Sequence, residues 1–109
     1  LVIDELLNFD IQSIQKIELP ENYSWDLTIK ELKHYNKIVD LTNKEKLFLD
    51  LLLSKKNKVF TYDDIFEYVW NFEDEINLNG LKNLVKRLRK KLPEDTILNI
   101  FNEGYKINF

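Results

Sequence analysis

The stretch from Asn79 to Leu92 reads NGLKNLVKRLRKKL, and the rest of the chain is best interpreted from it. It holds six Lys or Arg and no acid, whereas all other residues together carry ten bases and nineteen acids. Positive charge is therefore concentrated in one segment. Apolar residues recur at helical spacing, which predicts an amphipathic helix packed on a core. The residues of this stripe are Leu81, Leu84, Val85, Leu88 and Leu92.

The opposite side of the predicted helix is basic and polar. It would present Lys82, Asn83, Lys86, Arg87 and Lys90. A basic helical face is either ordinary solvated surface or a nucleic-acid-binding face, and this stripe alone leaves both open.

Composition narrows the class of protein. With 109 residues and 44% hydrophobic content, the chain predicts one domain with a modest core. It has no long apolar run, no signal sequence and no cysteine, so we expect a soluble cytoplasmic protein without disulfides or membrane contact. A single histidine, His34, predicts no metal site, and no cofactor is expected. The chain begins at Leu1 and lacks Met, which suggests a fragment or processed form.

The net charge of minus three argues against indiscriminate nucleic-acid binding, because nonspecific affinity comes mainly from phosphate neutralisation. Any such binding should be local and oriented by the basic helix.

The N-terminal part predicts a sheet. Residues 1–15 are interpreted as a linker or the tail of a preceding domain, or else as a docking surface, and residues 16–109 as the domain itself. A strand should end before Pro20, which forces Leu19 toward extended geometry. From Tyr23 to Leu41 apolar residues alternate, and this predicts two or three short antiparallel strands with turns near 30–31 and 34–37.

Two helices are predicted before the basic one. Thr42 with Glu45 forms a capping box, and that helix should end near Lys56 or Asn57. Its predicted buried stripe is Leu47, Phe48, Leu51, Leu52 and Leu53. After a brief extended Val59-Phe60, a second helix should begin at Thr61 with an apolar face of Ile65, Phe66, Val69 and Trp70.

An acidic loop, 71–77, leads from this second helix into the basic helix. Two helices and a loop before a basic third helix make a helix-turn-helix arrangement.

A hairpin should follow the basic helix. Pro93 is expected to stop the helix after Leu92, and residues 97–101 and 105–109 are predicted as two strands. The connection 102–104 places Gly104 where a positive φ is expected. The predicted fold class is thus α+β: a winged helix-turn-helix with a short N-terminal antiparallel sheet, three helices and a C-terminal β-hairpin wing.

These residues resemble the OmpR/PhoB-type winged-helix effector domain of bacterial two-component response regulators. Leu41-Thr42 with Glu45 is similar to the family's L-T-x-x-E-x-x-L-L helix start, and Val69-Trp70 to the end of its second helix. The family's I-x-x-L-R-x-K-L helix is matched by Val85, Leu88, Arg89, Lys91 and Leu92. Its closing G-Y-K is matched by Gly104-Tyr105-Lys106.

The resemblance implies a DNA-binding role for named residues. Arg87 falls where the family places a base-contacting Arg, Lys86 and Arg89 at backbone or base-edge positions, and Asn83 one turn earlier. Tyr62 and Trp70 fall where residues near the second helix approach phosphates, although Trp70 could equally be a core residue. The wing would contact phosphate through Asn99, Asn102 or Lys106.

The wing departs from the family pattern. An Arg often precedes the wing turn, whereas this chain has Phe101 and Asn102 there, with the acid Glu103 at the tip. A carboxylate facing the minor groove would be repelled by its negative potential, so minor-groove insertion is not expected.

The resemblance also implies partners: double-stranded DNA, an upstream phosphorylatable receiver domain, RNA polymerase through the 71–77 loop, and a second copy as a dimer or tandem on DNA. The predicted function is that of a sequence-specific DNA-binding effector domain that regulates transcription. The alternative is a winged helix used for protein–protein interaction, which the pI of 5.2 and the acidic wing and loop would favour. No nucleophile, base and orienting group fall into a recognisable arrangement, so an enzyme is not expected.

Overall fold

A computed structural model of the chain describes residues 15–71, 73 and 77–109. The chain divides into two compact units, and the boundary between them in the sequence lies between Val39 and Asp40. Nearly all of the predicted linker, residues 1–15, lies outside the described residues, so its interpretation stays a prediction. Among the helices that the structure describes, none is both long and apolar enough to cross a membrane.

The first unit is a four-stranded antiparallel sheet in the order β1-β2-β3-β4. The polypeptide turns at Pro20–Asn22, as Pro20 predicted, and again after Asp26, whose carboxylate accepts hydrogen bonds from the backbone N–H groups of Thr28 and Ile29. His34 ends β3 and stacks on the ring of Tyr23 at 3.9 Å between centroids. The strands are β1 Lys16–Leu19, β2 Tyr23–Asp26, β3 Glu31–His34 and β4 Lys37–Val39.

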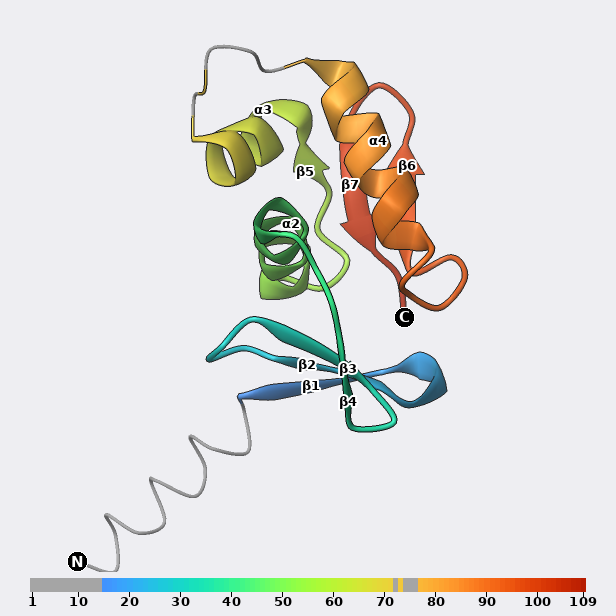
Figure 1. The fold of residues 1–109 in the computed structure, drawn as a ribbon. Helices are drawn as coiled ribbons and strands as arrows, with labels where there is room; N and C mark the ends of the chain where they lie inside the picture. The colour runs from blue at the N-terminus through green and yellow to red at the C-terminus, as the bar shows by residue number, and fades with distance from the viewer. Residues whose placement is uncertain (1–14, 72, 74–76) are drawn as a thin grey trace, which may run out of the picture. The chain divides into compact units, whose positions relative to one another are not determined.

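The second unit contains three helical segments and a small sheet (Figure 1). Together with the first unit, these elements confirm the predicted fold class. The helical segments are α2 Asn43–Ser54, α3 Tyr62–Ile65 continued by a π-helical turn η2 Phe66–Trp70, and α4 Leu78–Arg89. The strands are β5 Phe60–Thr61, β6 Ile97–Ile100 and β7 Gly104–Ile107.

Helix α2 begins as predicted and buries a slightly different face. The Thr42 hydroxyl accepts from the Glu45 N–H at 3.2 Å, and the Glu45 carboxylate accepts from the Thr42 N–H at 2.7 Å. Leu49 is buried, whereas Leu47 and Leu51 are only half-buried, so the predicted stripe was wrong at these positions. Because this helix has several leucines close together in the sequence, more than one of its faces could form the buried stripe. Packing within the unit decides which face is buried. The helix ends at Ser54, two or three residues before the predicted end at Lys56 or Asn57.

The second helix also begins at its predicted cap. Thr61 and Asp64 form a reciprocal capping box, with bonds of 3.0 and 3.1 Å. After Ile65 the backbone winds more loosely as the π-helical turn η2, which ends at Asn71 in a left-handed conformation with φ of 50°.

All five predicted apolar residues are buried: four of them lie in helix α4, and the fifth, Leu92, lies just past its end. The helix begins at Leu78, because the Asn77 side chain accepts from the Gly80 N–H at 2.7 Å. It ends at Arg89, three residues earlier than predicted. The N–H groups of Lys90 and Lys91 bond to carbonyls only three residues back, which is the tightening expected of a last turn that approaches Pro93.

The second sheet has the order β5-β7-β6. Strands β6 and β7 form the predicted hairpin, and Phe60 of β5 pairs with Tyr105 of β7, a long-range pairing that was not predicted. Gly104 has the positive φ that was predicted for it, at 158°, and Asn102 in the same turn has a φ of 58°. Gly104 has a second role that was not predicted: a Cβ there would lie 1.8 Å from the Phe60 carbonyl oxygen, so only glycine lets β5 approach this closely.

Candidate nucleic-acid interface

The exposed face of α4 presents the predicted basic and polar residues. Its opposite face is fixed against the interior by Leu81, Leu84, Val85 and Leu88, which are at most 2% exposed. Among the residues that the structure describes, no hydrogen bond or ion pair engages the side chains of the exposed set. This set, called the α4 outer face below, comprises Lys82, Asn83, Lys86, Arg87 and Lys90.

Two cations of the same stretch have partners within the protein. The Arg89 guanidinium donates to the carbonyl oxygen of Ile97 at 3.0 Å, which joins α4 to β6. Lys91 pairs with the carboxylate of buried Glu45 at 2.9 Å. Arg89 thus has a bond to the wing that the side chains of the α4 outer face lack, and its predicted DNA contact stays a prediction.

The wing turn and the beginning of α3 line one shared hollow of about 480 Å³. Tyr62 and Asn102, predicted separately from two parts of the sequence, are thus brought together. Two exposed carboxylates, Asp63 and Glu103, line the same hollow. Asp63 was not predicted as part of this hollow, because an acid in the first turn of a helix is already explained by the helix terminus.

The three remaining predicted residues differ in how exposed their side chains are. Trp70 is only 8% exposed, its ring lies 5.7 Å from that of Phe66, and Lys44 Nζ lies 5.4 Å from its centroid. These contacts favour the core alternative for its indole. Lys106 is half-buried in β7 opposite Leu98, and Asn99 is exposed in β6.

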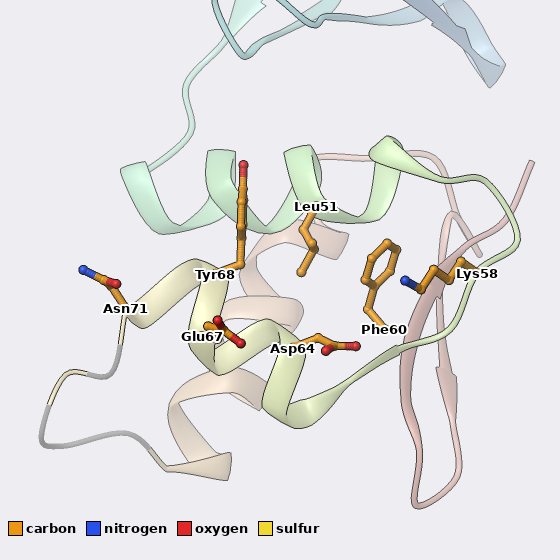
Figure 2. Close-up of a pocket in the computed structure, with 7 residues that line it drawn as sticks. All are labelled: Leu51, Lys58, Phe60, Asp64, Glu67, Tyr68 and Asn71. Carbon is orange, nitrogen blue, oxygen red and sulfur yellow. The ribbon is translucent and has the colours of Figure 1, made fainter.

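A second hollow, of about 490 Å³, lies between α2 and the α3–η2 segment (Figure 2). Leu51 and Phe60 supply apolar lining, and Asp64 and Glu67 supply carboxylates. It contains none of the predicted site residues, and its acidic lining disfavours an anionic nucleic-acid backbone. The remaining lining residues are Lys58, Tyr68 and Asn71.

Three ionisable groups are perturbed by these contacts. Burial by itself raises the pKa of Glu45, but hydrogen bonds from Thr42 and Lys91 outweigh it and hold the pKa below its ordinary value. The hydrogen bond to Asp50, with burial, raises the pKa of Tyr68 to about 12. Burial, reinforced by neighbouring Tyr62 and opposed by the Arg89 guanidinium, raises the pKa of Tyr105. None of these groups lies on the α4 outer face, so its charge is set by lysine and arginine alone.

The sequence matches the family described as "Transcriptional regulatory protein, C terminal" over residues 36–107. This range includes the whole second unit except its last two residues and therefore the α4 outer face and the wing.

Individual relatives agree with this match. The chain is 31% identical over 83 residues to the response regulator protein GraR of Staphylococcus epidermidis. The aligned region covers 72% of this chain and 37% of GraR. It resembles the crystal structure of the DNA-binding domain of Bacillus subtilis CssR, with 31% identity, a TM-score of 0.66, and coverage of 79% of this chain and 99% of that one. It also resembles the Thermotoga maritima response regulator DrrB, an OmpR/PhoB homologue, with 24% identity, a TM-score of 0.75, and coverage of 87% and 45%. The chain thus spans well under half of the length of GraR.

Proposed function

The chain belongs to the OmpR/PhoB-type family of transcriptional regulatory DNA-binding domains, and from this premise we propose that it binds DNA sequence-specifically through the α4 outer face. It is the output domain of a two-component response regulator in this proposal. The observation that carries it is one helix whose exposed side is cationic, within a chain that is otherwise acidic.

The geometry suits the major groove of DNA. That groove is about 12 Å wide and admits a helix. Arg87 is assigned to a base edge, most favourably guanine, to which a guanidinium donates two hydrogen bonds. Asn83, one turn earlier, is assigned to adenine, and Lys82, Lys86 and Lys90 to phosphates.

The wing and the beginning of α3 are assigned a weaker, flanking role. Tyr62 and Asn102 line one hollow and would donate hydrogen bonds to a phosphate. Asp63 and Glu103 in the same hollow oppose this contact electrostatically. We therefore propose phosphate contact by the wing without insertion into the minor groove.

Partners follow from family membership. We propose that a phosphorylatable receiver domain precedes this domain in the complete protein, which fits the short span of GraR that the chain matches. We propose contact with RNA polymerase through the 71–77 loop, most of which lies outside the described residues. Two copies would occupy DNA as a dimer or tandem in the cytoplasm. We infer no catalytic role, because the family regulates transcription through DNA binding.

The test is selection of duplexes from a random-sequence pool with the 109-residue chain, followed by affinity measurements at several salt concentrations. We expect enrichment of a common sequence and a log–log salt slope near −3, since each neutralised phosphate contributes about −0.9 and three lysines of the α4 outer face are available. No enrichment, together with salt-independent binding, would favour the protein-docking alternative. Lys55→Gln, Lys56→Gln and Lys58→Gln form the matched control, because they remove three exposed lysines outside α4.

A further inference from the structure

An ion pair between Glu45 and Lys91 connects the beginning of α2 to the segment that follows α4. Glu45 lies in the first turn of α2 with no exposed surface, and Lys91 lies two residues past the end of α4 with its side chain 32% exposed. One carboxylate oxygen, Oε1, accepts hydrogen bonds from the Thr42 N–H at 2.7 Å and from Lys91 Nζ at 2.9 Å. The other oxygen, Oε2, is buried and has no partner among the described residues.

Lys91 is the carboxylate's only cationic partner among the described residues. A buried charge that loses its partner is strongly destabilising, since the carboxylate would remain without water or a counter-ion. Lys91 therefore cannot turn toward DNA without this cost. Its attachment holds the end of α4 at a fixed place on α2.

The position of α4 matters more for reading bases than for attracting phosphates. A hydrogen bond to a base edge requires a donor–acceptor distance of about 2.7 to 3.2 Å and weakens steeply outside good geometry. Attraction between exposed charges and phosphates decays over about 8 Å at physiological ionic strength. A small displacement of α4 would therefore remove specific contacts and leave most nonspecific attraction in place.

We propose that Glu45 is a positioning residue for DNA recognition: through Lys91 it fixes the end of α4 against α2, so that Arg87 and Asn83 meet base edges in register. This inference rests on the proposed function. The inference also gives Lys91 a structural role, as the partner of Glu45, although Lys91 belongs to the basic stretch from Asn79 to Leu92.

The experiment compares Glu45→Gln, Lys91→Met and the double variant, each measured on a selected duplex and on a duplex of unrelated sequence. Glutamine keeps an oxygen that can accept from the Thr42 N–H, so the capping box can persist while the ion pair is lost. We expect the preference for the selected duplex to fall roughly 5- to 100-fold, the loss of about one base contact. Nonspecific affinity and its salt slope should hardly change.

The double variant should lose no more preference than either single variant, because both act through one bond. Lys91→Arg is expected to retain the preference. Lys90→Met is the matched control on the exposed side and should weaken both duplexes, lowering the magnitude of the salt slope by about 0.9. Circular dichroism at the assay temperature establishes that each variant is folded, and should Glu45→Gln be unfolded, Lys91→Met decides the question.

Each result has a defined meaning. A folded variant with lower thermal stability but an unchanged preference would make the pair merely structural and overturn the inference. If Lys91→Met lowers the magnitude of the log–log salt slope by about one unit on both duplexes, Lys91 is a phosphate contact. That result would also overturn the inference. If the unchanged chain shows no preference between duplexes, the proposed function itself fails.

Discussion

Arg89 donates a hydrogen bond to the carbonyl oxygen of Ile97, so the last residue of α4 is bonded to the first residue of β6 at 3.0 Å. The wing is therefore bonded directly to the helix that carries the α4 outer face. A charge in the β6–β7 turn has a defined place relative to α4, and its effect on DNA can be tested directly.

Reversing the charge of Glu103 is expected to tighten DNA binding. The residue is exposed in the wing turn, where its carboxylate opposes the cations of the α4 outer face. Glu103→Lys should add about one phosphate contact and steepen the log–log salt dependence by roughly 0.9. Affinity for one duplex at several salt concentrations measures both quantities.

Glu94→Lys is the matched control, because it makes the same charge change in the exposed segment between α4 and β6, at the other end of the hairpin. It should change the slope far less. An unchanged slope and affinity for Glu103→Lys would mean that the wing does not approach DNA.

Arg87→Ala should flatten the preference among variant duplexes more than it weakens nonspecific binding. A bidentate contact from Arg to guanine discriminates by about 1 to 3 kcal/mol. Competition among duplexes that differ at one base pair measures this discrimination, with Lys86→Ala as the comparison on the same face. Uniform weakening on every duplex would instead make Arg87 a phosphate contact.

DNA should be occupied by two copies at half-sites about one helical turn apart. A single module of this size buries roughly 600 to 1,000 Å² on DNA, which limits the specificity of one copy. Footprinting and the stoichiometry of binding to duplexes with one or two half-sites measure the arrangement. Full affinity for an isolated half-site would contradict it.

Gly104→Ala should destabilise the fold by roughly 1 to 3 kcal/mol, because the new methyl group would overlap the Phe60 carbonyl and separate β5 from β7. Gly80→Ala should instead stabilise the fold by about 0.5 to 1 kcal/mol, because alanine suits a helix better than glycine does. A Cβ at Gly80 has room, since its nearest neighbouring atom lies 3.6 Å away. Urea unfolding of both variants measures the contrast. Equal stability of the two variants would refute the close approach.

The free energy of unfolding should depend on the charge of Glu45 in the acid range. The fold lowers the pKa of this carboxyl below its ordinary value near 4.5, so its contribution is present above that value and is lost as the pH falls through the lowered pKa. Glu45→Gln should therefore flatten the decline of stability on acidification. Urea unfolding at a series of pH values from 7 to 3 measures the slope, and Lys91→Met, which removes one of two partners, should flatten it only in part.

Much of the fold was predictable because local chemistry specifies it. The capping box at Thr42, the beginning of the second helix at Thr61 and the apolar stripe of α4 were all found where the residues placed them. Each depends on side chains within one or two turns of the same helix, so the sequence spacing alone contains the information.

Tertiary contacts account for the features that were missed. The pairing of β5 with β7, the internal bonds of Arg89 and Lys91, and the hollow shared by Tyr62 and Asn102 all join distant segments. Gly104 shows the same limit: a turn glycine suggests backbone conformation, whereas the close approach of Phe60 becomes visible only in three dimensions.

The pairing of Phe60 with Tyr105 also has a consequence for the order of folding during synthesis. At 5 to 20 residues per second, Phe60 leaves the ribosome about 2 to 9 s before its partner. The residues of α3 and α4 also leave the ribosome before those of β7, so both helices are complete in sequence before β5 has a strand to join. The helix that carries the α4 outer face is thus synthesised before β7, and β5 can pair with β7 only afterwards.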